Sequence, residues 1–311
     1  MRFLTPIVVL VLLAARPAAG QTSRAADWKA PRTPDGHPDL QGLWTNTSLT
    51  PLERPANLAG KESFTEEEAA AYERGIVQKR AEDPNDGEGD VADPKVWWER
   101  ATKVSTRRTS LIVDPPNGRI PALTPEAQKH MADLRAAARL HPADGPEDRS
   151  LQERCILSPT SGPPMLPGPY NNNYQVVQTP DHLMIAIEMI HDLRIVPLDG
   201  RPHAPPSVRK WLGDSVGRWE GNTLVVDTTN FTDQTHFRGS DRNLHLIERF
   251  TRTGPEAMLY EFTVDDPTAF VKPWKAEVPM SMSAGPMYEF ACHEGNRALE
   301  RILSIARQSE K

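Results

Sequence analysis

The chain has 311 residues, of which 38% are hydrophobic and 25% are charged, a balance typical of a globular protein. Its 30 prolines disfavour a mainly helical fold, and its 19 glycines follow no triplet period, which excludes collagen. The formal net charge of −6 and the lack of a basic block in the sequence disfavour nucleic acid as a partner.

The first 20 residues have the features of a secretory signal peptide. Arg2 supplies a basic start, Leu4 to Ala15 form an apolar stretch, and Ala18-Ala19-Gly20 is a small-residue cleavage site. The apolar stretch is shorter than the roughly 20 residues that span a bilayer, so an uncleaved anchor is the weaker alternative. We expect cleavage before Gln21, a periplasmic or secreted location, and no transmembrane span in the mature chain.

The prolines are concentrated in the front of the chain. There are 23 between Pro31 and Pro206, against 5 from Ser207 to the end. We therefore expect two regions after the signal peptide. Residues 21–172 form an irregular, proline-rich region that wraps the fold, and residues 173–311 form an antiparallel β-barrel-like domain.

Two helices are predicted in the wrapping region. The first covers Ser63–Asp83, where Thr65 and Glu68 form a capping box. The second begins after the N-cap residue of the segment Thr124–Leu140, with proline at its first position. A third, short helix is expected at Asp93–Arg100.

From residue 173 onward the pattern changes to short strands with alternating polarity. We predict nine strands, at Tyr174–Thr179, His182–Met189, Asp192–Leu198, Gly217–Glu220, Thr223–Phe231, Leu244–Arg252, Met258–Asp265, Trp274–Met282 and Met287–His293. Gly221-Asn222 is a two-residue hairpin signal. Strands with such short connections predict a mainly β fold, an antiparallel barrel or a strongly curved sheet.

Two segments resemble known groups of proteins. Gly42-Leu43-Trp44 resembles the start of lipocalin-like (calycin) barrels, in which a Gly-x-Trp plugs the closed end. The stretch from Asp214 to Asp227, with its Gly-Arg-Trp-Glu-Gly centre, resembles that of a widespread, uncharacterised group of exported bacterial proteins. The second resemblance extends over most of the mature chain and implies export, but no particular activity.

Cys155 and Cys292 are the only cysteines, and an even pair in an oxidising compartment suggests a disulfide. The bond would tie the middle of the chain to its last predicted strand. Two separate buried thiols are the alternative, since free cysteine is often part of a hydrophobic core.

Strand alternation gathers a set of polar residues on one face, namely His245, Arg249, Glu261, Glu277, Glu289 and His293. These residues either form the solvated face of a sheet or line a cavity and provide acid/base groups or metal ligands. The sequence contains no nucleophile elbow, zinc-protease, phosphate-loop or dinucleotide motif. No short spacing of His, Asp or Glu supports a particular metal, so no metal ligands are assigned, and the metal content and the cofactor stay open.

Strand alternation places two ionisable residues on strand faces that are otherwise apolar. Glu248 follows Leu246 on such a face, where a carboxylate is costly unless it is paired. It is either half of a structural ion pair with an arginine or a desolvated carboxyl suited to general acid/base catalysis. His191 either lies in a turn with Asp192 or acts as a proton shuttle.

The loop Thr232–Asp241 between two predicted strands is dense in hydrogen-bonding groups. His236 and Arg238 in this loop are suited to gripping a carboxylate, a phosphate or sugar hydroxyls. The alternative is a solvated connection, which a polar loop with glycine also favours.

The leading hypothesis is an exported enzyme, such as a hydrolase or lyase, that acts on a small organic or glycan-derived substrate by acid/base catalysis. The candidates for proton transfer are Glu248, His191, His245 and His293. The candidates for substrate binding are Arg194, His236, Arg238, Trp219 and Tyr170. The alternative is a non-catalytic, lipocalin-like binder that holds an apolar small molecule in the barrel, with Trp44 and Trp219 near its base.

Overall fold

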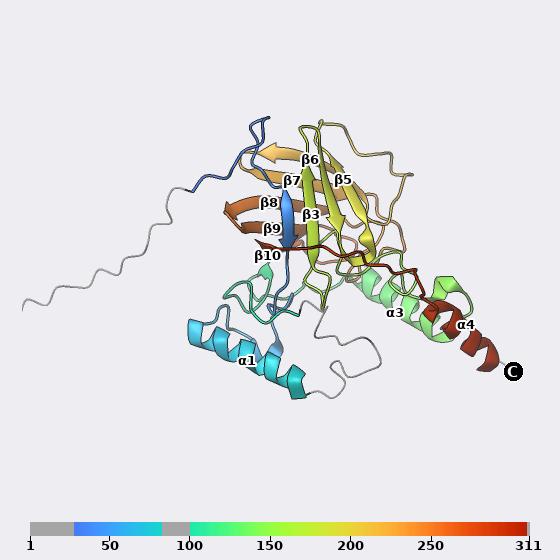
Figure 1. The fold of residues 1–311 in the computed structure, drawn as a ribbon. Helices are drawn as coiled ribbons and strands as arrows, with labels where there is room; N and C mark the ends of the chain where they lie inside the picture. The colour runs from blue at the N-terminus through green and yellow to red at the C-terminus, as the bar shows by residue number, and fades with distance from the viewer. Residues whose placement is uncertain (1–27, 83–99, 310–311) are drawn as a thin grey trace, which may run out of the picture.

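The computed structural model describes residues 28–82 and 100–309. Nine strands form a nearly closed antiparallel barrel (Figure 1): β1 Gly42–Thr45, β3 Asn173–Gln178, β4 His182–Ile187, β5 Leu193–Pro197, β6 Asp214–Glu220, β7 Thr223–Thr229, β8 Leu246–Gly254, β9 Ala257–Val264 and β10 Trp274–Met282. Their order is β5-β4-β3-β1-β10-β9-β8-β7-β6, and the short strand β2 (Ile112–Asp114) pairs with β10. The predicted mainly β barrel is confirmed. The expected signal peptide and the helix expected from Asp93 lie outside the described residues.

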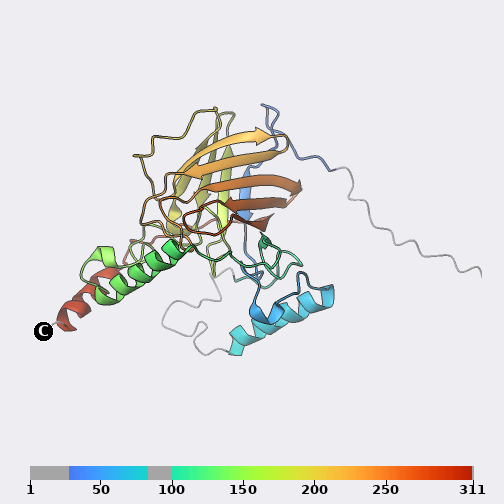
Figure 2. The same ribbon diagram turned by 180° about the vertical axis from the view of Figure 1, so that it is seen from behind.

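The helices are α1 (Glu66–Glu82), α3 (Pro125–Leu140) and α4 (Ala298–Ser309), with single 3-10 turns η1 (Ala56–Leu58), η2 (Pro146–Asp148) and η3 (Met189–His191). The predicted caps of α1 and α3 are present. The Thr65 N–H donates to Glu68 Oε2 (2.8 Å), the Glu68 N–H donates to Thr65 Oγ1 (3.2 Å), and the Ala127 N–H donates to Thr124 Oγ1 (3.1 Å). Two opposite views show α4 beside α3, projecting away from the barrel (Figures 1 and 2). In the described part of the chain, none of the helices has the length and apolar character needed to span a membrane.

The ninth barrel strand comes from the front of the chain and not from its end. Within β1, Trp44 lies opposite Tyr174 of β3 on one side and opposite Met282 of β10 on the other. The strand predicted at Met287–His293 is wrong, because β1 occupies the edge of β10 that a further hairpin would need. Residues 283–297 are irregular instead.

Large side chains fill the interior of the barrel. Six aromatic residues are less than 2% exposed there, namely Trp44, Trp274, Tyr174, Tyr260, Phe250 and Phe262. The guanidinium of Arg252 lies 5.5 Å from the centre of the Trp44 ring, a cation–π contact. An interior packed in this way disfavours the hypothesis that an apolar ligand occupies the barrel.

The seam between β5 and β6 is closed by side chains and not by backbone hydrogen bonds. Strands β5 and β6 stand at the two ends of the sheet order and share no ladder of backbone hydrogen bonds. Gly217 allows them to approach, because a Cβ there would lie 2.6 Å from Leu198 Cδ2 and 3.0 Å from Val196 Cγ1. Across the seam, Arg194 Nε donates to Ser215 Oγ (3.0 Å).

Cys155 and Cys292 form the predicted disulfide, with Cα atoms 5.8 Å apart. The bond joins the turn region after η2 to the irregular segment between β10 and α4. A second contact at this end comes from Arg307 of α4, which donates to the Ala143 carbonyl (3.3 Å). The C-terminal segment is therefore tied to the middle of the chain by the disulfide and by hydrogen bonds.

Candidate functional site

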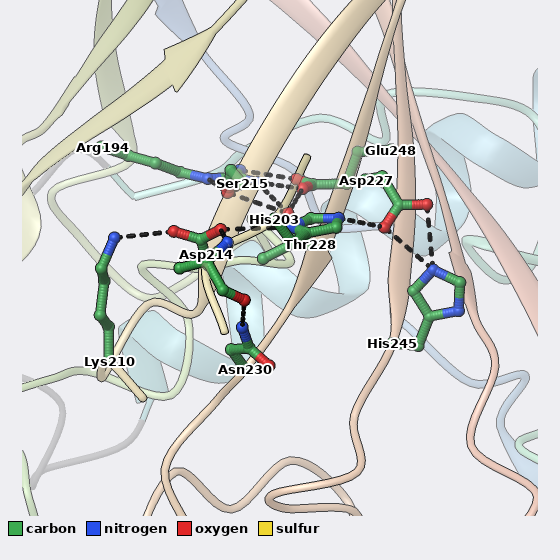
Figure 3. Close-up of polar contacts among 11 residues, drawn as sticks. Arg194, His203, Lys210, Asp214, Ser215, Asp227, Thr228, Asn230, His245 and Glu248 are labelled. Carbon is green, nitrogen blue, oxygen red and sulfur yellow. Dashed lines mark hydrogen bonds and ion pairs between the residues drawn. The ribbon is translucent and has the colours of Figure 1, made fainter. Parts of the chain in front are cut away.

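A polar network inside the barrel surrounds Arg194 and Glu248 (Figure 3). Arg194 Nη1 donates to Glu248 Oε1 (2.9 Å), and Nη2 donates to the other carboxylate oxygen. Ser215 and Thr228 accept further hydrogen bonds from the guanidinium (3.0 and 2.7 Å). The Tyr260 hydroxyl donates to Glu248 Oε1 (2.9 Å), and burial together with the Glu248 charge raises the pKa of Tyr260 well above its usual value. This paired, fully buried geometry favours the structural alternative for Glu248.

A second polar cluster lies where the connection between β5 and β6 meets the start of β6 and the end of β7 (Figure 3). His203 lies between two carboxylates, with Nδ1 3.3 Å from Asp214 Oδ2 and Nε2 3.0 Å from Asp227 Oδ1. His245 Nε2 lies 3.1 Å from Asp227 Oδ2, and Lys210 Nζ donates to Asp214 Oδ1 (2.8 Å). These contacts hold the connection between β5 and β6 against the sheet, which is a structural role.

The stability that this cluster contributes depends on pH. The hydrogen bond to Asp227 raises the pKa of His245 above its usual 6.5, against the effect of partial burial. That contribution is therefore complete below pH 6.5 and is lost as the pH rises through the raised value. Burial opposes ionisation of Asp227, but hydrogen bonds with His245 and His203 outweigh it and lower the pKa of Asp227 below 3.8. The carboxylate's contribution is lost only as the pH falls through that lowered value.

We predict that His245→Gln is most destabilising near pH 6 and that its effect shrinks as the pH rises to about 9. Urea denaturation of both proteins across this range measures the difference in free energy of unfolding. His293→Gln is the control, because His293 is exposed in the segment after β10. A His245→Gln effect that does not change with pH would contradict the assignment.

A cavity of about 600 Å³ lies outside the barrel interior, where five separate segments meet. Its walls come from residues 48–52, from Ile76 and Arg80 of α1, from Leu111 just before β2, from the proline-rich segment 159–167, and from residues 236–238 after β7. The cavity is within the range of about 300–1,000 Å³ that is typical of small-molecule sites. His236 and Arg238, both predicted to bind substrate, are thus brought together in the lining of this cavity.

Buried residues on either side of His236 and Arg238 fix the position of the loop that carries them. The Thr235 hydroxyl donates to the Trp211 carbonyl (3.0 Å). The buried Phe237 ring stacks on Trp274 of β10 with ring centres 6.0 Å apart. Ser240, also buried, exchanges two backbone hydrogen bonds with Phe237 (2.8 and 2.9 Å). His236 and Arg238, on either side of Phe237, are therefore presented from a fixed backbone.

The environment of His236 suits it to accept a proton. Partial removal from water lowers the pKa of His236 below 6.5, and His130 adds to this effect. Asp241 and Asp233 act in the opposite direction but do not outweigh it. The imidazole is therefore mainly neutral at pH 7, which is the form that acts as a general base.

The other predicted site residues lie apart from this cavity. His191 is exposed in η3, next to Asp192, and its Nδ1 is 2.7 Å from the Phe290 carbonyl oxygen. The Trp219 ring stacks on His37, with centres 4.8 Å apart. Tyr170 is half-buried against the hydrophobic core.

Sequence reasoning missed several residues of both sites. Arg80 follows Ile76 by one helical turn, so an i, i+4 pattern could have placed both on one face of α1. Asp227 lies next to the inward-facing Thr228 on β7, and alternation could have placed it outside with His245. His203 carries no such signal, because it lies in an irregular proline-rich connection.

Within residues 28–82 and 100–309, no group of three or more His, Cys, Asp or Glu side chains is arranged to hold a metal ion. No protein-family model, curated protein or solved structure shows significant similarity to the chain. The resemblances to lipocalin-like barrels and to exported bacterial proteins therefore gain no support from these comparisons.

Proposed function

We propose that the protein is an exported enzyme that holds a small organic molecule in the cavity of about 600 Å³ and uses His236 as its general base. The observation that carries this proposal is the convergence of His236, Arg238 and Arg80 on one cavity from two distant parts of the chain. This cavity combines a space large enough for a substrate with a histidine whose pKa is lowered by partial removal from water.

The lining of the cavity supports a binding role. Leu49, Leu52, Leu111 and Leu166 supply apolar surface, and hydroxyl groups of serine and threonine lie among them. Binding sites commonly combine such an apolar surface with a few placed polar groups. The signal-like N-terminus and the motif that resembles exported bacterial proteins support the exported location.

The test begins with a thermal-shift screen of small organic acids, esters and sugar derivatives, followed by turnover assays on the compounds that bind. On the identified substrate, His236→Gln is expected to lower kcat by about 100-fold or more, the usual contribution of a general base, with little change in Kd. Glutamine retains hydrogen-bonding capacity but cannot take a proton at neutral pH.

His182→Gln is the matched control, since His182 lies on β4 and does not line this cavity. If His236→Gln keeps the kcat of the native protein, His236 is not the general base. Binding without turnover by any compound, with the ligand located in the same cavity, would favour the alternative of a non-catalytic binder.

A further inference from the structure

The charge of the cavity differs from that of the whole chain. The chain has 42 acidic and 36 basic residues, yet the cavity is lined by Arg80 and Arg238 and by no carboxylate among the described residues. We infer that the cavity takes an organic oxyanion, with a carboxylate or phosphate group held by the two arginines and an apolar body against the leucine-rich wall. This inference rests on the proposed function, because it assigns a substrate class to the same site.

Neither arginine has a carboxylate partner among the described residues. Arg80 Nη1 donates to the Ala101 carbonyl (2.8 Å), which leaves other N–H groups of its guanidinium for a ligand. Arg238 forms no ion pair with any described residue. By contrast, Arg249 is paired with Glu220 (2.9 Å). Two guanidinium groups that have no carboxylate partner in the described part of the chain favour a negatively charged occupant of the cavity.

The backbone at Arg238 is held in an uncommon conformation. Its φ of 57° lies in the left-handed region that non-glycine residues rarely adopt. The following Gly239 has φ 109°, and a Cβ there would lie 2.7 Å from Leu123 Cδ2. The buried anchors Phe237 and Ser240 maintain this turn from both sides. Strain that is maintained by its surroundings fits a residue held ready for a ligand.

Isothermal titration calorimetry with three compounds that share one apolar body tests the inference: 4-phenylbutyrate, 4-phenylbutyl phosphate and the neutral 4-phenylbutyramide. The two anions separate a carboxylate ligand from a phosphate ligand. At least one anion is expected to bind about tenfold or more tightly than the amide, because charge-assisted hydrogen bonds exceed neutral ones. Its affinity is also expected to fall as the salt concentration rises.

The arginine variants connect this preference to the cavity. Arg80→Gln and Arg238→Gln are each expected to weaken binding of the anion about tenfold and to leave binding of the amide within about twofold. Arg238→Lys keeps the charge and is expected to restore part of the loss. Arg218→Gln is the control, because Arg218 pairs with Glu220 on the outer side of β6 (2.7 Å). Circular dichroism checks that each variant is folded.

Equal affinity for amide and anions, or anion binding that neither glutamine variant weakens, would overturn the inference. The absence of binding by all three compounds would also overturn it. If the amide binds equally well and a crystal structure places it beside His236, the anion assignment fails while the proposed function stands. If the anions bind at a different place on the protein, the inference fails, and the proposed function is then decided by the kcat of His236→Gln alone.

Discussion

Replacing Arg194 with methionine is expected to lower the free energy of unfolding by about 3–5 kcal/mol, because the substitution leaves the Glu248 carboxylate buried without a counter-ion. Glu248 is 0% exposed, so water cannot replace the lost partner without opening the barrel. Glu248→Gln is expected to cost a similar amount, since it leaves a buried guanidinium without its negative charge. Urea denaturation of the purified variants measures both effects.

The double variant Arg194→Met/Glu248→Gln separates the buried charge from the loss of packing. It contains no unpaired charge, and glutamine still accepts the hydrogen bond from Tyr260. We expect the double variant to lose about 1–3 kcal/mol less free energy of unfolding than the sum of the losses of the two single variants. The exposed pair Arg249 and Glu220 is the matched control, and its variants are expected to cost less than about 1 kcal/mol. Single variants of the buried pair that cost no more than this control would contradict the assignment.

The same variants report on the seam of the barrel. Arg194 joins β5 to Ser215 of β6, where no backbone ladder exists. Hydrogen exchange in Arg194→Met is therefore expected to accelerate first in β5, before the central strands β8 and β9. Uniform acceleration across all strands would contradict a specific role for Arg194 at the seam.

Removing the disulfide has the second large expected effect. Cys155 and Cys292 are separated by 137 residues, and a cross-link over so long a loop restricts the unfolded chain strongly. Replacing both by serine is expected to lower the free energy of unfolding by about 4–5 kcal/mol on chain-entropy grounds. Urea denaturation of the oxidised native protein and of the double serine variant measures the difference.

A reducing agent provides the matched control for this prediction. It is expected to destabilise the native protein and to leave the double serine variant unchanged. Limited proteolysis is expected to cut the reduced protein first within residues 283–297, because this irregular segment loses its covalent link to the middle of the chain. Equal stability of the native protein with and without reductant would contradict the prediction.

Features that depend on neighbouring residues were predictable from the sequence. The capping box of Thr65 and Glu68 needs three residues of spacing, and the Gly221-Asn222 turn needs two residues with suitable backbone freedom. Strand alternation likewise placed Leu246 and Glu248 on one face, and both are buried in the barrel. In each case the physical cause acts over a few residues, so a single sequence contains it.

Features that depend on which segments meet required the tertiary structure. The place of β1 between β3 and β10 depends on competition between distant strands for one sheet edge, which the prediction at Met287–His293 missed. Alternation showed that Glu248 points inward, but only the closure of the barrel brings Arg194 to it across the seam.

For the candidate site too, the sequence predicted one part and only the tertiary structure determined the rest. The polar loop with His236 and Arg238 was visible in the sequence because its residue types and its place between strands are local properties. Its cavity arises only when α1, with Arg80, and the proline-rich segment 159–167 fold against that loop. Local chemistry therefore identified two of the residues, whereas the packing of distant segments determined the space they face and the charge within it.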